Sequence, residues 1–203
     1  MNVAIAPARP TNARPITPLR APGSRAEAGE SGPGGDQIVV EAYRPAWPGQ
    51  FRVEAEVLRT ALSNLAPRVE HVGSTAVAGL PARPTVDILL GVLRPADIDA
   101  HTSRLRNFGY APAPHSDNDG EQRRFLARTV RGALTHHVHV VEAFSHTWHR
   151  LLLFRDLLRI DPQLVSEYAA LKRSLAARYA KNRIAYTAGK TAFIQAVLGL
   201  PSA

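Results

Sequence analysis

The chain has 203 residues, of which 45% are hydrophobic and 21% charged, and it contains neither an apolar run long enough to span a membrane nor the apolar core of a secretory signal. It contains no cysteine, which excludes disulfide and thiol chemistry and leads us to expect a protein of the reducing cytoplasm. Its net charge of +8 favours an anionic small-molecule partner, whereas nucleic acid is not expected because no run of five basic residues occurs.

The first part of the chain divides into a tail and the start of a folded domain. Residues 1–36 are rich in proline and glycine and show no hydrophobic periodicity, so we expect a disordered tail and a single domain over 37–203. The domain should begin with a strand over 38–43. A helix follows over 47–65, where apolar residues recur at helical spacing, and then a short strand over 68–72 ends at a glycine turn.

The middle of the chain has the alternation and turns of a sheet. An apolar strand is expected over 85–92, followed by a helix that a proline opens over 95–107. The segment 112–122 is rich in turn-forming residues and predicts a mobile loop. Two strands over 124–130 and 134–142 flank an Arg-Gly turn and should pair.

The last third of the chain is predicted to be helical, over 148–160, 162–179 and 184–198. Asp161 and Pro162 form a good helix start, because aspartate caps the free amides and proline suits the first helical position. Strands with intervening helices, followed by helices alone, predict an α/β (α+β) fold with a mixed sheet.

A glycine turn and one acid stand out in this pattern. Gly73 permits a tight turn, and Ser74 and Thr75 can cap a short helix whose amides attract phosphate oxygens. Asp87 lies thirteen positions after Ser74, inside the apolar strand, and alternation turns it toward the glycine turn.

Burial of an unpaired carboxylate is costly, so Asp87 is expected to face a metal, a base or a strong hydrogen-bond donor. A purely structural pairing with Arg83 or Arg124 is the alternative. Arg124 also borders the predicted loop, where it could hold an anionic substrate.

The strand over 134–142 carries a second group of polar side chains. Alternation places His137 and His139 on one face, beside the position expected for Asp87. Two imidazoles and a carboxylate can hold a transition metal, or they can act as a metal-free acid/base pair that Asp87 orients. On the last helix, Tyr186 and Lys190 are four residues apart and share a face, so Lys190 either meets an anion or extends to solvent.

Several sequence blocks together resemble one family. The string EHVGSTAVAGLPARPTVDI is similar to the GrpB family of the nucleotidyltransferase superfamily, as are IVVEAYRPAW, HHVHV, LLFRDLLR and AYTAGKTAFI, which follow in order from about residue 38 to 198. The resemblance implies a nucleotidyltransferase-like fold. It also suggests Arg155 as an anion contact, although an ion pair with Asp156 is the structural alternative.

The resemblance raises the question of magnesium. In this superfamily, two carboxylates one residue apart on the acid strand usually hold Mg²⁺, which neutralises triphosphate charge. Here the second position is Leu89, which cannot ligate a metal, and Asp87 alone would bind Mg²⁺ poorly.

Three functions remain open from the sequence. The first is a nucleotidyltransferase-like enzyme in which the glycine turn holds a triphosphate and Asp87 holds Mg²⁺. The second is a metal-free acid/base enzyme, catalysing dehydration, cyclisation or isomerisation, and the third is a non-catalytic nucleotide-binding module. The sequence indicates neither the substrate nor the oligomeric state. The candidate catalytic residues are Asp87, His137 and His139, and the candidate substrate-binding residues are Gly73, Ser74, Thr75, Arg83, Arg124, Arg155, Tyr186 and Lys190.

Overall fold

The computed structural model describes residues 37–113 and 123–200. The predictions for the tail over 1–36 and for nearly all of the loop over 112–122 therefore lie outside the described residues. No helix within the described ranges has the length and apolar character that a membrane crossing requires.

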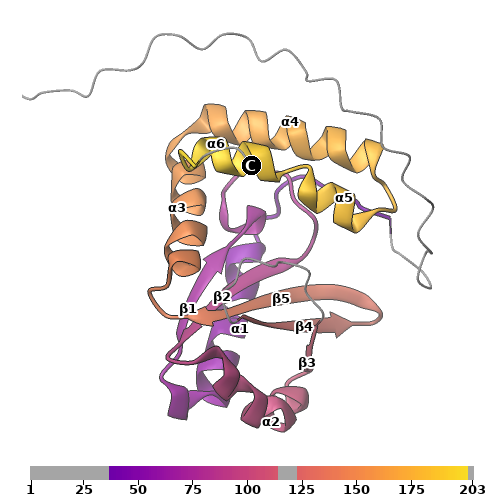
Figure 1. The fold of residues 1–203 in the computed structure, drawn as a ribbon. Helices are drawn as coiled ribbons and strands as arrows, with labels where there is room; N and C mark the ends of the chain where they lie inside the picture. The colour runs from indigo at the N-terminus through magenta and orange to yellow at the C-terminus, as the bar shows by residue number, and fades with distance from the viewer. Residues whose placement is uncertain (1–36, 114–122, 201–203) are drawn as a thin grey trace, which may run out of the picture. The chain divides into compact units, whose positions relative to one another are not determined.

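A five-stranded mixed sheet forms the centre of the domain, with the strand order β1-β2-β5-β4-β3 (Figure 1). β2 and β5 are parallel neighbours, and every other neighbouring pair is antiparallel. The strands are β1 (Arg68–Val72), β2 (Val86–Val92), β3 (Tyr110–Pro112), β4 (Arg124–Val130) and β5 (Ala133–Glu142).

Helices precede, interrupt and follow the strands. The α-helices are α1 (Trp47–Ala61), α2 (Thr102–Asn107), α3 (His146–Ile160), α4 (Pro162–Arg178), α5 (Arg183–Ala188) and α6 (Thr191–Val197). Three 3₁₀ segments are η1 (Ser63–Leu65), η2 (Ser74–Ala76) and η3 (Pro95–His101). The predicted start of α4 is confirmed, because the Asp161 carboxylate accepts hydrogen bonds from the amides of Gln163 and Leu164.

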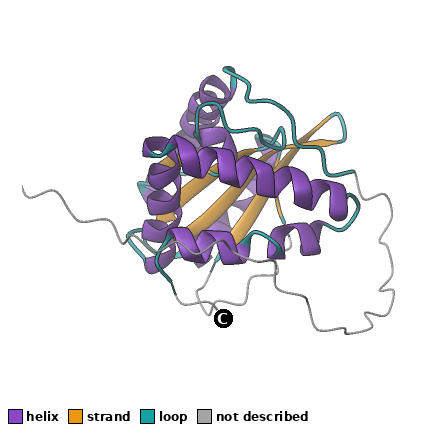
Figure 2. Cartoon of the chain, turned by 90° about the horizontal axis from the view of Figure 1, so that it is seen from above, coloured by secondary structure: helices purple, strands orange, loops and turns teal. Residues whose placement is uncertain are grey.

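The two faces of the sheet are covered differently. On one face, α1 and α2 pack on the main apolar core, which includes Ile88, Leu90 and Val138. On the other face, Trp148 of α3 packs against Leu89 and its neighbours, while α4 lies above the strands, as the view from above shows (Figure 2). Alternation along β2 therefore points residues 87 and 89 toward the side of α3.

Two local predictions were wrong because tertiary packing decided the outcome, and one short strand was not predicted. The expected strand over 38–43 is only a single bridge between Glu41 and Ala82, since Ile38 bonds and packs beside the end of α4. The short strand β3 was not predicted. The expected last helix breaks into α5 and α6 at Gly189, where a Cβ would lie 2.5 Å from a methyl group of Leu175.

Candidate functional site

Gly73 brings the turn after β1 directly against Asp87. Its φ of +68° is in the region that favours glycine. A Cβ at this position would lie 2.5 Å from Asp87 Oδ2, so a side chain has no room there. The turn then enters η2, in which Ser74 is partly exposed and Thr75 is buried. The close approach that the sequence indicated therefore exists, and it joins the turn to the acid.

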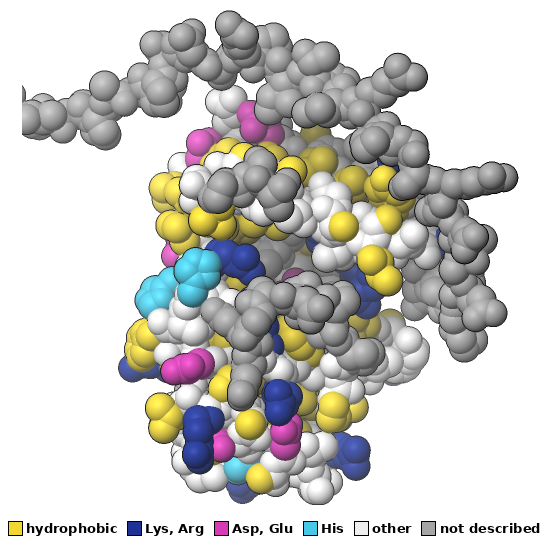
Figure 3. Space-filling view, in the orientation of Figure 1, with side chains coloured by type: hydrophobic (Ala, Val, Ile, Leu, Met, Phe, Trp, Pro, Cys, Tyr) yellow, Lys and Arg dark blue, Asp and Glu magenta, His cyan; other side chains and the backbone are white. Residues whose placement is uncertain are grey.

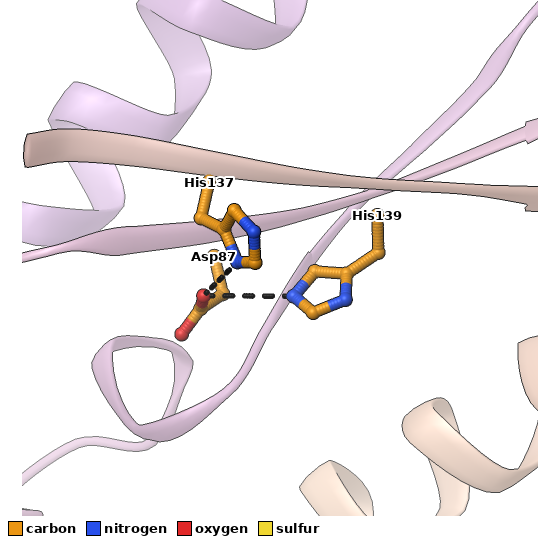
Figure 4. Close-up of side chains that lie close together, drawn as sticks. All are labelled: Asp87, His137 and His139. Atoms are coloured by element: carbon orange, nitrogen blue, oxygen red, sulfur yellow. Dashed lines mark ion pairs between the residues drawn. The ribbon is translucent and has the colours of Figure 1, made fainter. Parts of the chain in front are cut away.

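Asp87 lies between two imidazoles (Figure 4). Its Oδ1 is 3.6 Å from His137 Nδ1 and 3.6 Å from His139 Nε2, because the parallel register sets Asp87 beside His137 and Leu89 beside His139. Burial alone raises the pKa of the Asp87 carboxyl, but the two histidine contacts outweigh burial and hold that pKa well below its usual range. Asp87 is therefore an anion held by imidazoles.

Apolar residues of β4 and β2 lie next to this cluster. The ring of Phe125, opposite His139 on β4, lies 5.6 Å from the His137 ring and 5.4 Å from the His139 ring, centroid to centroid. Leu89 is fully buried and packs with Trp148. The position of the usual second carboxylate thus belongs to the core, so the residues present do not fit the two-carboxylate magnesium site of the fold family.

Lys172 of α4 is a site residue that the sequence reasoning missed. Its side chain is buried, with the residue 2% exposed, and its Nζ donates a 2.8 Å hydrogen bond to Ser74 Oγ and another to the carbonyl oxygen of Pro81. Burial, and then the charge of Lys190, lower the pKa of Lys172 to about 7. The signal in the sequence was its helical spacing from Tyr168 and Leu175, which are core positions.

Other cations act electrostatically on the same place. Lys190 interacts with Lys172, and Arg83 and Asp87 both interact with Arg183 at the start of α5. On the face that Figure 3 shows, basic side chains are scattered among acidic and apolar ones and form no continuous stripe. The positive charge that acts on the site includes that of Lys172, Lys190 and Arg183 on the C-terminal helices.

Four of the predicted substrate-binding side chains are held by other protein groups. Thr75 pairs its hydroxyl with buried His71 Nε2 at 3.0 Å. Tyr186 belongs to a core cluster, although Lys190 Nζ does lie 4.7 Å from its ring centre, as the spacing predicted.

The two arginines among these four anchor other elements. Arg124 lies on the opposite face of the sheet from Asp87 and pairs with Asp99 at 3.0 Å. Arg155 joins α3 to β1 through ion pairs with Glu70 and Asp156. Arg124 therefore does not lie near Asp87, and the guanidinium of Arg155 is already paired with two carboxylates.

Comparisons with known proteins agree with this architecture. The sequence profile described as GrpB protein matches residues 37–199. A UPF0157 protein of Pseudomonas aeruginosa is 41% identical over 167 residues, which are 81% of this chain and 67% of that protein. The crystal structure of the conserved protein GrpB from Enterococcus faecalis superposes with a TM-score of 0.68 at 34% identity, covering 78% of this chain and 94% of that one.

A more distant solved structure extends the likeness of fold. The Cid1 poly(U) polymerase with Mg 3'-dATP bound has a TM-score of 0.50 at 14% identity and covers 74% of this chain and 49% of that one. This similarity shows a shared nucleotidyltransferase-type fold, as the sequence predicted.

Proposed function

The chain belongs to the GrpB family, and on that premise we propose that it is an enzyme that binds an anionic small molecule beside Ser74 and Lys172 and transforms it by proton transfer at Asp87, His137 and His139. The observation that carries the proposal is the buried Lys172 ammonium, bonded to the hydroxyl of the glycine turn that borders Asp87.

The binding half of the proposal rests on charge. Among the described residues no carboxylate forms a direct ion pair with Lys172, whose partners are a hydroxyl, a carbonyl oxygen and the Tyr168 ring. The charge of Asp87 acts on Lys172 as well, but without direct contact. A buried cation without a counter-ion is costly, and its pKa is lowered accordingly to about 7. A phosphate or carboxylate group that reaches Ser74 would supply the missing negative charge, and Lys190 would add to the attraction.

The chemical half of the proposal rests on the carboxylate and the imidazoles. A histidine beside an ionised aspartate is suited to accept and return protons, directly or through a water molecule. Nucleotidyl transfer with two carboxylate-bound Mg²⁺ ions has less support, since Leu89 is buried under Trp148. The remaining chemistry is a proton-transfer reaction such as dehydration, cyclisation or isomerisation.

The test separates binding from turnover. Thermal unfolding is followed with inorganic phosphate, pyrophosphate and nucleoside triphosphates, with and without Mg²⁺, for the unchanged chain, for Lys172→Met and for the control Lys181→Met at an exposed position. We expect anions to stabilise the unchanged chain and the control but not Lys172→Met, without a requirement for Mg²⁺. The absence of any anion response in the unchanged chain would contradict the proposal.

A second variant examines the chemistry. Asp87→Asn should still be stabilised by the anion, because Ser74 and Lys172 are intact, while turnover of a substrate falls by at least about 100-fold. Anion binding with turnover unchanged in Asp87→Asn would remove this centre from the reaction. Anion binding with no turnover of any compound in the unchanged chain would favour a non-catalytic module.

A further inference from the structure

The three side chains at the centre of the candidate site have the donor set of a metal site. Among the described residues, Asp87, His137 and His139 each offer one ligand atom, and these atoms lie within 4.8 Å of one another. We propose that this centre binds one divalent transition-metal ion through an Asp87 carboxylate oxygen, His137 Nδ1 and His139 Nε2. Zn²⁺ serves as the test ion for this class of metal. The inference deepens the proposed function and rests on it only for the role of the bound ion.

The distances already approach those of a bound ion. Zn²⁺ lies about 2.0–2.2 Å from nitrogen and oxygen ligands, so tetrahedral coordination separates the ligand atoms by about 3.3–3.5 Å. In the structure, the distances from Asp87 Oδ1 to His137 Nδ1 and to His139 Nε2 are both 3.6 Å, and all three ligand atoms lie within 4.8 Å of one another. Small side-chain rotations would complete the coordination, because hydrogen bonding between β2 and β5 fixes the backbones that carry all three ligands.

The donor atoms select the class of metal. Two imidazoles and one carboxylate suit Zn²⁺, Fe²⁺, Ni²⁺ or Co²⁺, whereas Mg²⁺ prefers an all-oxygen shell. The expected second carboxylate of the fold family is here the buried Leu89, and the position opposite it on the parallel strand is His139. The site therefore offers an imidazole nitrogen on the neighbouring strand where the fold family has a second carboxylate oxygen. This donor set is unsuited to Mg²⁺ and suits a softer ion.

The site has the openness of a reactive metal centre. Three protein ligands leave at least one coordination position for water or substrate, as in catalytic zinc sites, whereas structural sites use four. The side chains of Asp87, His137 and His139 are 31%, 13% and 20% exposed, so an ion and a small molecule can reach them. A metal-bound water can lose its proton near neutral pH, and with the ion bound it would act as the base in place of the two coordinated imidazoles.

Packing around the imidazoles also favours coordination. Phe125 contacts both rings, and the two rings lie 4.7 Å apart, centroid to centroid, at 68° to each other. This packing limits rotation of the imidazoles in the absence of an ion, so less conformational entropy is lost on binding.

The experiment is a metal titration that needs no substrate. The full chain without an affinity tag is freed of metal with a chelator and titrated with Zn²⁺ by calorimetry, and with Co²⁺ by visible absorption, which reports the coordination geometry. We expect one equivalent of each ion to bind. Asp87→Asn and His139→Ala should weaken binding by more than about 100-fold, while His149→Ala, at an exposed position of α3, should leave it unchanged.

The outcomes separate this inference from the proposed function. Circular dichroism establishes that each variant is folded, and the near-isosteric Asp87→Asn provides the test if His139→Ala is not. The inference is overturned if the unchanged chain binds no equivalent of Zn²⁺, if both variants bind as the unchanged chain does, or if Mg²⁺ displaces Zn²⁺ at equal concentration. Anion binding without metal binding would contradict the metal site alone. Metal binding without any stabilisation by anions would contradict the proposed function alone.

Discussion

Buried charges on the two sides of the sheet are satisfied in different ways. On the side of α1, the Glu54 carboxylate accepts a 2.7 Å hydrogen bond from the Tyr110 hydroxyl and pairs with Arg128, so its charge is neutralised within the protein. On the side of α3 and α4, the described partners of Lys172 are the Ser74 hydroxyl, the Pro81 carbonyl oxygen and the Tyr168 ring, and none of them is a carboxylate. We call the side of α1 the closed side, because its buried charges are paired within the protein. We call the side of α3 and α4 the open side, because an anion is proposed to bind there.

The largest expected change in stability comes from removing a buried charge partner on the closed side. Glu54→Ala removes the acceptor of Tyr110 and the counter-ion of Arg128, and we expect it to lower the free energy of unfolding by about 3 kcal/mol or more. Urea unfolding measures the loss. The residual folded protein should keep its anion response, and loss of that response at equal folded fraction would contradict the separation of the two sides.

His71 predicts how the closed side responds to acid. It is buried against Phe51, and burial is the main cause that lowers its pKa to about 4, with the charges of Arg159 and Arg155 adding to this and Asp87 opposing it.

Between about pH 6.5 and pH 4, His71 binds a proton in the unfolded chain but not in the folded chain. The free energy of unfolding should therefore fall as pH falls through this range, by at most about 3 kcal/mol. Urea unfolding at a series of pH values measures this slope, which should be smaller in His71→Gln. A variant with an unchanged slope would show that another group causes it.

A smaller effect of opposite sign is expected on the open side. Lys172→Met should raise the free energy of unfolding by about 1–2 kcal/mol at neutral pH, because it removes a buried charge, and should abolish the anion response.

The pH dependence follows from the same burial. The pKa of Lys172 is about 7 in the folded chain and 10.5 ordinarily, so the unfolded chain binds more protons between these values. The unchanged chain should therefore gain stability as pH rises through this range, and Lys172→Met should not. Denaturation of both at several pH values checks this, and parallel curves would refute it.

Arg124 gives the smallest expected effect. Its ion pair with Asp99 is exposed, with the two side chains 38% and 60% accessible, and Arg124→Ala should change stability by less than about 1 kcal/mol. Its anion response should equal that of the unchanged chain, measured by the same thermal shift. A lost response would mean that Arg124 reaches the ligand in spite of its position on the opposite face.

The sequence predicted most strands and helices, and the meeting of Asp87 with His137 and His139, because alternation along a strand is a local property. It did not predict Lys172, whose partner Ser74 lies 98 positions away on a segment that only tertiary folding brings near. For the same reason, it did not predict the ion pair of Arg155 with the distant Glu70, although the pair with Asp156 was one of its alternatives. The prediction of a strand over 38–43 was wrong because this segment bonds and packs beside the end of α4, which no local pattern indicates.

The central claim is that the Lys172 ammonium anchors the anion, and the pH dependence of binding tests it most directly. The affinity for adenosine triphosphate is measured by calorimetry from about pH 7 to pH 9.5, where the phosphates of the ligand are already ionised. Because the pKa of Lys172 is about 7, the affinity should fall by up to about tenfold for each pH unit above that value. An affinity that stays constant across this range would show that a different cation, or none, holds the ligand.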